Sequence, residues 1–111
     1  MTESDFWPAL EYRVCRKLAG MDDERQSLWC DGFIPDEYHL DDADPRIIGR
    51  AWIGRGPDRQ EAWPFRLDLD APVLGKDRIQ WDELLPAEER TAWLAIDVDR
   101  RTVRISPHLA E

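Results

Sequence analysis

The sequence predicts one α+β domain, residues 1–111, in which an N-terminal amphipathic helix packs on an antiparallel sheet of about four to six strands. Two observations carry this prediction. Large apolar residues recur at helical spacing near the N-terminus, and they alternate strictly with polar residues in two later segments. A chain of 111 residues with six tryptophans can fill one core, and it shows no linker, repeat or low-complexity tract.

The helix is predicted over residues 6–21. At about 100° per residue, its large apolar side chains fall within one arc of about 120°. These side chains are Phe6, Trp7, Leu10, Val14, Leu18 and Met21. Ser4 or Asp5 can cap the first turn, and Pro8 would then lie in that turn, where its missing N–H costs little. Gly20 favours an end to the helix there.

Residues 28–40 mix apolar side chains with turn-forming pairs at Asp31-Gly32 and Pro35-Asp36. Two interpretations stay open at Asp31-Gly32: a tight hairpin turn, or a glycine bulge within one bent strand. An acidic loop at residues 41–45 ends this part of the chain.

The strongest strand signal lies at residues 62–69, where apolar residues alternate with polar or small ones. The apolar residues are Trp63, Phe65, Leu67 and Leu69. A preceding strand at 47–54 is joined to it by the turn-rich loop 55–60. Pro64 has no N–H for a ladder, which predicts that its strand lies at a sheet edge or bulges there.

A register that sets small residues opposite large ones is predicted for these two strands. Its pairs are Ile53 with Trp63, Ala51 with Phe65, and Gly49 with Leu67. The other face of the two strands then carries Ile48, Arg50, Trp52, Arg66 and Asp68. Arg50, Trp52 and Arg66 therefore share one face, which either stacks a ligand or lies under a second layer formed by the first helix or the Trp81 segment.

Short helical turns are predicted around Trp81–Leu85 and Pro86–Thr91, before a C-terminal hairpin. The hairpin is predicted to turn at Arg100-Arg101. It pairs Val98 with Val103 and Ile96 with Ile105 on the buried side, and Asp97 with Arg104 on the wet side.

The net charge of −9 is unevenly distributed along the chain. Residues 22–44 hold nine acidic residues and one arginine, whereas residues 46–66 hold five arginines and two acidic residues. This asymmetry predicts a bipolar molecule. The negative total and the lack of a domain-wide basic surface make nucleic acid an unlikely ligand.

Candidate catalytic groups form no motif, and no catalytic residue is predicted. Cys30 lies beside Asp31 rather than beside a helix start or a basic cluster, which predicts a buried thiol with a raised pKa rather than a nucleophile paired with His39. Two cysteines without Cys-x-x-Cys spacing predict reduced thiols. The carboxylate pairs Asp68/Asp70 and Asp97/Asp99 are predicted to be exposed and to serve solubility and cross-strand pairing.

The acidic segment holds a cluster of oxygen ligands around His39, but its spacing fits neither a calcium loop nor a zinc site, so no metal or cofactor is predicted. The cluster is interpreted as a solvated surface that can meet a partner. Its candidate binding residues are Asp36, Glu37, Asp41, Asp42 and Asp44.

These features predict a small, acidic, non-catalytic protein-interaction or adaptor module whose acidic segment, residues 22–44, meets a basic surface of a partner protein. The alternative is a small-ligand-binding module or minor enzyme that uses the face of Trp52, Arg50 and Arg66. Residues 1–5 lack signal-peptide features and no apolar run reaches membrane-spanning length, so a cytoplasmic protein without a membrane segment is expected. The excess of arginine over lysine suggests a bacterial source.

Overall fold

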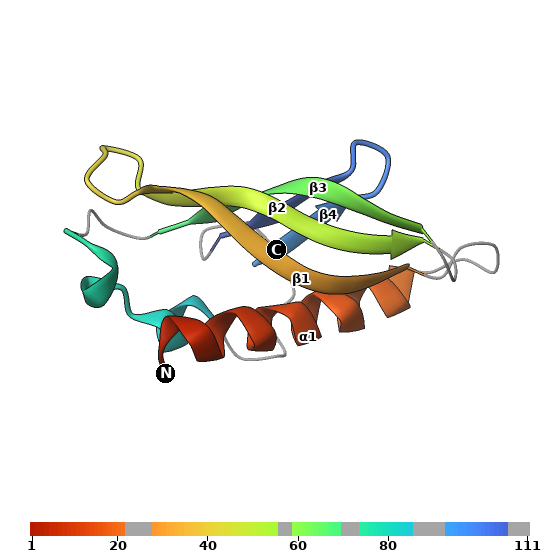
Figure 1. The fold of residues 1–111 in the computed structure, drawn as a ribbon, viewed down its shortest axis with the longest axis horizontal. Helices are drawn as coiled ribbons and strands as arrows, with labels where there is room; N and C mark the ends of the chain where they lie inside the picture. The colour runs from red at the N-terminus through yellow and green to blue at the C-terminus, as the bar shows by residue number, and fades with distance from the viewer. Residues whose placement is uncertain (22–27, 56–58, 70–73, 86–92, 107–111) are drawn as a thin grey trace.

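A computed structural model describes residues 1–21, 28–55, 59–69, 74–85 and 93–106. Over these residues the chain forms one long helix, then three long strands, two short 3₁₀ turns and a small C-terminal hairpin (Figure 1). In order, the elements are α1 (Glu3–Met21), β1 (Leu28–His39), β2 (Arg46–Arg55), β3 (Arg59–Asp68), η1 (Lys76–Arg78), η2 (Trp81–Leu84), β4 (Leu94–Asp97) and β5 (Thr102–Ile105). The predicted α+β class, with α1 packed on a sheet, is confirmed.

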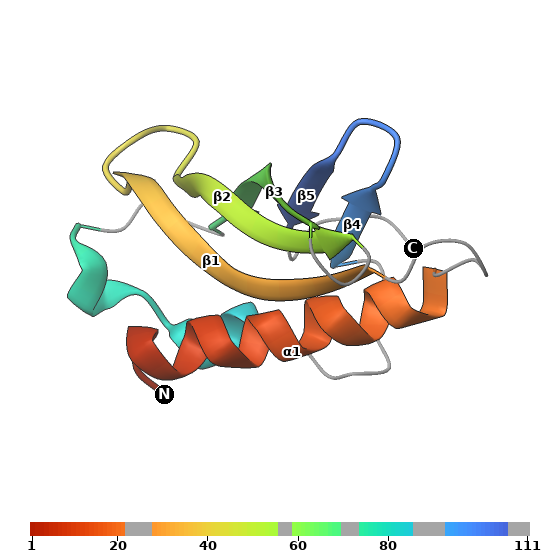
Figure 2. The ribbon, with the colours of Figure 1, turned by 45° about the vertical axis from the view of Figure 1, so that its right-hand side comes forward.

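The five strands form one mixed sheet in the order β1-β2-β3-β5-β4. Three neighbouring pairs are antiparallel, but β3 and β5 run parallel, so the prediction of a purely antiparallel sheet is wrong at this place. The cause is topological. The hairpin β4–β5 docks through its second strand, which lies between β3 and β4 (Figure 2), and local alternation in the sequence does not say which strand of a hairpin joins the sheet.

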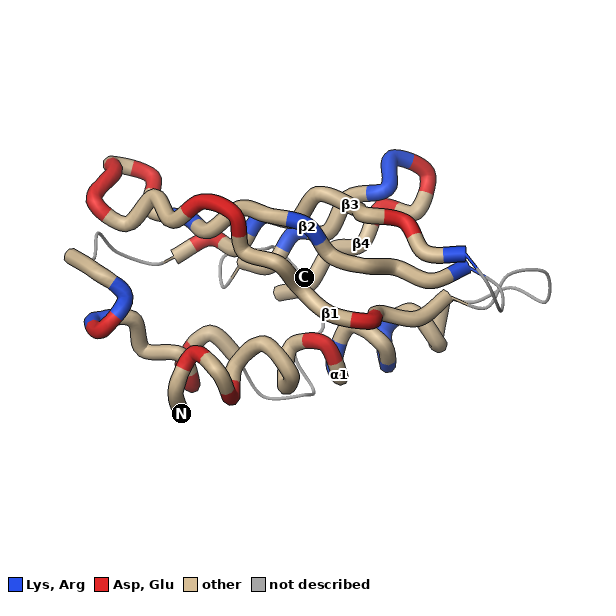
Figure 3. Tube along the Cα trace, in the orientation of Figure 1, with Lys and Arg blue, Asp and Glu red and all other residues tan. Residues whose placement is uncertain are grey.

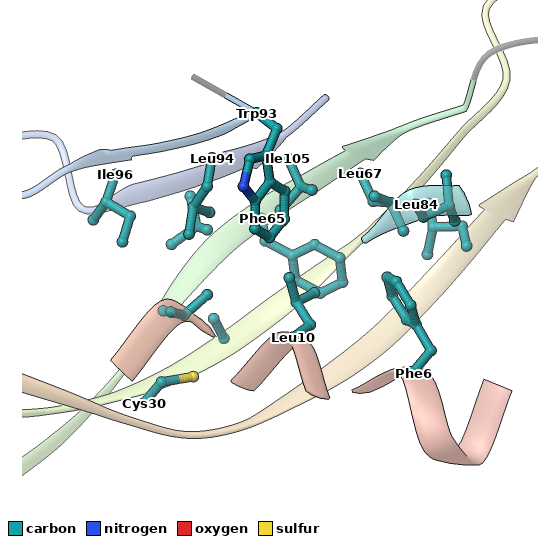
Figure 4. Packing of buried hydrophobic residues seen from close by; sticks show 14 of the residues in the cluster. Phe6, Leu10, Cys30, Phe65, Leu67, Leu84, Trp93, Leu94, Ile96 and Ile105 are labelled. Carbon is teal, nitrogen blue, oxygen red and sulfur yellow. The ribbon is translucent and has the colours of Figure 1, made fainter. Parts of the chain in front are cut away.

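Helix α1 covers one face of the sheet with the apolar stripe that the sequence predicts. Phe6, Leu10, Val14 and Leu18 are fully buried, whereas Met21, at the end of the predicted stripe, is exposed. Figure 4 shows Phe6 and Leu10 pointing from the helix toward Phe65 of β3, in the middle of the core. Among the described helices, none combines the length and the apolarity needed to cross a bilayer.

The ends of α1 differ from the prediction. The helix begins at Glu3, so Ser4 and Asp5 lie inside it, and Thr2 bonds to the Asp5 carboxylate through both its hydroxyl (3.0 Å) and its backbone N–H (3.3 Å). Pro8 consequently falls in the second turn, and Gly20 lies within the last turn. The predicted start was too late because the residues before Phe6 are polar and carry no apolar periodicity.

Strand β1 is one bent strand, so the bulge interpretation of Asp31-Gly32 is confirmed and the hairpin is excluded. The pairing with β2 shifts between Cys30 and Phe33, where Gly32 takes a φ of 137° that favours glycine. A second shift lies between Pro35 and Glu37. These two irregularities decide which side chains of β1 point toward α1.

The β2–β3 hairpin forms, but its register lies two residues from the predicted one. The observed pairs include Ala51 with Trp63, Gly49 with Phe65, and Ile47 with Leu67. Because side chains alternate with a period of two, an even shift keeps every residue on its predicted face. The strands continue to Arg55 and Arg59, which leaves a shorter connection than the loop 55–60 that the turn-forming residues suggested.

Pro64 does not lie in an edge strand, since β3 is third in the order of five. The parallel partner β5 nevertheless pairs only with Phe65, Arg66 and Leu67 of β3. Pro64 thus lies just before the residues of β3 that pair with β5. Its missing N–H therefore removes no hydrogen bond from that ladder.

The C-terminal hairpin is also confirmed with a register two residues away, pairing Ile96 with Val103 and Asp97 with Thr102. A wider turn explains the shift. The Asp97 carboxylate accepts the backbone N–H of Arg100 at 3.0 Å, and Arg101 adopts a left-handed φ of 56°. Of the two predicted helical turns, η2 is confirmed, whereas Pro86–Thr91 lies outside the described residues.

Candidate functional site

Among the residues that the structure describes, four large apolar side chains lie on the face of the sheet that points away from α1. They are Trp29, Ile34, Ile48 and Trp52. Ile48 and Trp52 alternate along β2 with Ile47, Ala51 and Ile53, which are fully buried beneath α1. All four are partly buried and lie outside the core cluster. We call this surface, with the other outward side chains of the five strands, the open face.

The described helical elements leave the open face uncovered. Leu10 of α1 and Trp81 of η2 both belong to the core on the opposite side, where Trp81 packs against Phe6 at 5.0 Å between ring centroids. Figures 1 and 2 show both elements below the sheet. The expectation that α1 or the Trp81 segment makes Trp52 part of the core is therefore not met within the described residues.

Trp29 lies flat against a glycine of the neighbouring strand. A Cβ atom added at Gly54 would lie 2.1 Å from Trp29 Cε2, so only glycine leaves room for the indole ring. Gly54 is the second residue after Trp52 on the same side of β2, so Trp29 and Trp52 lie toward the same end of the open face.

Carboxylates of the acidic segment pair with arginines of β2 and β3. Asp36 takes a bidentate bond from Arg50, with Nε and Nη2 at 3.0 and 3.1 Å from its two oxygens. Asp44 accepts Arg66 Nη2 at 2.5 Å. A further pair joins Asp42 to Arg46 at 3.4 Å. The prediction of a bipolar molecule is wrong for this region. Strands β1 and β2 run side by side, so acidic residues of one strand lie beside basic residues of the other (Figure 3).

Asp68 is buried, contrary to the prediction that it is exposed. Its side chain keeps 9% of its surface accessible and accepts Arg66 Nε at 2.5 Å and Arg104 Nη2 at 2.9 Å. Burial by itself would raise the pKa of the Asp68 carboxyl, but hydrogen bonds from both arginines outweigh it and hold the pKa below its usual value. Asp70 lies outside the described residues, whereas Asp97 and Asp99 are exposed as predicted.

Replacing Asp68 with asparagine is expected to lower the free energy of unfolding by about 1–3 kcal/mol at neutral pH, because two arginines lose their shared charged acceptor. Since the folded-state pKa is depressed, the ionised carboxyl stabilises the fold above the unfolded-state pKa of roughly 4, and this contribution is lost as pH falls through the folded-state pKa. Urea melts at neutral and acid pH measure the effect. If wild type and Asp68→Asn differ in free energy of unfolding by as much at acid pH as at neutral pH, the ionised carboxyl does not have this role.

The structure brings some of the candidate residues together and separates others. Arg50, Arg66, Asp36 and Asp44 form ion pairs on or beside the open face that also carries Trp52. Glu37 is 59% exposed there and has His39 at 3.9 Å. Asp41 and Asp42 lie in the loop at one end of the sheet, away from the centre of the face.

Three residues of the open face were missed in the sequence: Trp29, Ile34 and Arg104. Arg104 was assigned to the wet side of its hairpin, but its place beside Arg66 follows from the parallel β3–β5 pairing. The outward positions of Trp29 and Ile34 depend on the bulge at Gly32, which leaves them on the same side as Trp52.

The two thiols lie where α1 meets the edge strand β1. Cys15 Sγ accepts the backbone N–H of Cys30 and donates to its carbonyl oxygen, both at 3.1 Å. The thiol thus hydrogen-bonds backbone groups of an edge strand that would otherwise need a neighbouring strand. Both cysteines are free, and burial raises the pKa of Cys30 to about 12, as the sequence predicts for a poor nucleophile. His39 lies at the opposite end of β1 from Cys30, roughly 25–30 Å away along the strand, so the two form no catalytic pair.

Changing Cys15 to serine is expected to leave stability within about 1 kcal/mol of wild type, because a hydroxyl can also donate and accept. Changing Cys15 to alanine should cost about 1–3 kcal/mol, since the backbone groups of Cys30 lose their partner. Thermal or urea melts of the two variants decide the matter. Equal stability of the serine and alanine variants would show that the thiol merely fills space.

Within the described part of the chain, no group of three histidine, cysteine, aspartate or glutamate side chains converges as a metal site. No protein-family model, curated protein or solved structure matches this chain. The open face and its charges are therefore the features of the molecule that bear on its function.

Proposed function

We propose that this chain is a non-catalytic protein-interaction module that docks a partner protein on the open face of its sheet. The observation that carries the proposal is the set of partly buried apolar side chains, Trp29, Ile34, Ile48 and Trp52, on the side of the sheet opposite α1 and η2. Tryptophan is enriched at the centre of protein interfaces, where an apolar core is surrounded by a polar rim. Arg50, Arg66 and Arg104, with their carboxylate partners, supply such a rim.

The acidic segment contributes one margin of this proposed interface. Asp36 and Glu37 both project from β1, the edge strand, and Asp44 lies beyond its end. Basic residues that a partner brings to this margin would pair with these carboxylates, and such contacts at an exposed margin weaken as salt increases. The structure describes the acidic segment only from residue 28 onward. The acids that support the proposal are therefore Asp36, Glu37 and Asp44.

The ion pairs favour a protein partner over a small anionic ligand. Arg50 is held by Asp36, and Arg66 is held by Asp44 and Asp68. Neither guanidinium is an uncompensated cation that a phosphate or carboxylate of a ligand would find unpaired. A small-ligand site or minor active site formed by Trp52, Arg50 and Arg66 is therefore the second candidate function, after docking of a protein on the open face.

We also place the proposed module in the bacterial cytoplasm. Two cysteines without a disulfide framework are typical of a reducing compartment. The strong preference for arginine over lysine supports a bacterial source.

Affinity capture from an extract of the source cells tests the proposal. Baits are the wild-type chain, Trp52→Lys on the open face, and Tyr12→Lys as a matched control, because Tyr12 is 61% exposed on the far side of α1. Wild type and Tyr12→Lys are expected to retain the same partner, and Trp52→Lys to lose it. Equal capture by all three baits would contradict the proposal.

A further inference from the structure

We propose that the partner on the open face is a second copy of this chain, packed face to face across a two-fold axis that runs parallel to the strands between β2 and β3. This inference rests on the proposed function, because it names the occupant of the same surface. Three properties of the face support it: its charge, the order of its charged strands, and the match of large with small side chains.

The open face is close to neutral on a strongly acidic chain. Among the described strand residues, four arginines and five acids point outward on it, against a total of −9 for the chain. The arginines are Arg46, Arg50, Arg66 and Arg104, and the acids are Asp31, Asp36, Glu37, Asp68 and Asp97. Two copies that approach through other surfaces bring net negative charge together, whereas this face adds little repulsion.

The charges are ordered so that the face complements itself. Outward charges on β1 are all acidic, and the outward charge on β5 is Arg104. The ladders put Glu37, Ile48, Arg66 and Arg104 in one row across four strands. Rotation about an axis along the strands between β2 and β3 exchanges the two ends of this row, so Glu37 of each copy lies over Arg104 of the other.

Both members of this contact are available in the single chain. The Glu37 side chain is 59% exposed, and that of Arg104 is 55% exposed while it keeps its bond to Asp68. The two-fold axis produces the contact twice. Two opposite charges at each margin would set the register of one sheet on the other.

Trp52 fits the same axis, and in the row of Glu37 the rotation sets Ile48 of each copy over Arg66 of the other. Trp52 pairs laterally with Ala62, and the rotation exchanges these two residues, so each indole lies over the small side chain of the other copy. Aligned packing of two twisted sheets, with the helices on the outside, is the usual arrangement for such faces. Large side chains over small ones allow the layers to interdigitate.

Light scattering and sedimentation velocity over a dilution series test the inference. The wild-type chain and Tyr12→Lys are expected to dimerise, and Trp52→Lys to weaken the dimer by roughly 100-fold or more, since a buried ammonium would face apolar side chains. A wild-type chain that is monomeric at every concentration overturns the inference. If capture from the extract still depends on Trp52 in that case, the proposed function stands without it.

A charge exchange tests the orientation. Glu37→Arg alone sets arginine against Arg104, and Arg104→Glu alone sets glutamate against Glu37, so each variant should dimerise roughly 100-fold more weakly. Mixing the two variants makes both contacts complementary, and a heterodimer is expected. Failure of the mixture to associate, with both variants folded by urea melts, overturns the proposed axis. If Arg104→Glu does not fold, a Glu37→Arg dimer as tight as wild type overturns it instead.

Discussion

Truncating Phe65 to alanine is expected to lower the free energy of unfolding by about 3–5 kcal/mol. Phe65 is 3% exposed and packs edge-on against Phe33 at 5.2 Å and Trp7 at 5.7 Å between ring centroids. The ring links β3 to the bent part of β1 and to α1, so its removal leaves a cavity at the meeting point of three elements (Figure 4). A loss of this size approaches the whole stability of a small domain.

Tyr12→Ala is the matched control for Phe65, because it removes an aromatic ring of similar size from the exposed side of α1. Its free energy of unfolding should stay within about 0.5 kcal/mol of wild type. Urea melts of the two variants provide the comparison. A Phe65→Ala protein as stable as the Tyr12→Ala protein would mean that the assigned core face is wrong.

Replacing Gly49 with alanine is the second change with a large expected effect. An added Cβ atom would lie 2.1 Å from the carbonyl oxygen of Ile34 and 2.9 Å from the backbone nitrogen of Asp36. Both contacts are with backbone atoms of β1, which cannot rotate away as a side chain could. The crowded position lies at the second irregularity of β1, so the variant should lose about 3 kcal/mol or more, or unpair this part of β1.

Gly20→Ala makes the opposite prediction with the same chemical change. Gly20 lies in the last turn of α1, and an added Cβ there meets no atom within 4 Å. Alanine is the better helix former, so this variant should gain up to about 1 kcal/mol. Melting both glycine variants side by side measures the contrast. Two variants of equal stability would show that β1 does not approach Gly49 as described.

Side-chain alternation predicted which face each strand residue occupies, but not the exact partner across the ladder. In both hairpins the observed register lies two residues from the predicted one, and Trp63 and Val103 stay buried in either case. The burial pattern cannot separate registers that differ by two, because both put the same residues inside. Turn geometry separates them, as at Arg101 with its left-handed φ of 56°.

The candidate site was predictable only where it depends on one strand pair. Trp52, Arg50 and Arg66 follow from alternation in β2 and β3, and the structure places them on one face. The bond from Arg50 to Asp36 depends on a pairing between β1 and β2 that passes through two irregularities. The sequence pattern does not locate such irregularities closely enough, which is why segments of opposite charge were expected to form separate poles.

Hydroxyl-radical footprinting of the tryptophans, measured by mass spectrometry over a dilution series, tests the exposure of the open face most directly. In dilute protein, Trp29 and Trp52 on the open face should be oxidised much faster than Trp63 and Trp81, which are 0% and 5% exposed. As concentration rises and copies associate, oxidation of Trp29 and Trp52 should fall while the rate at Trp63 stays the same. Protection of Trp52 equal to that of Trp63 in the dilute monomer would contradict the open face and the docking surface built on it.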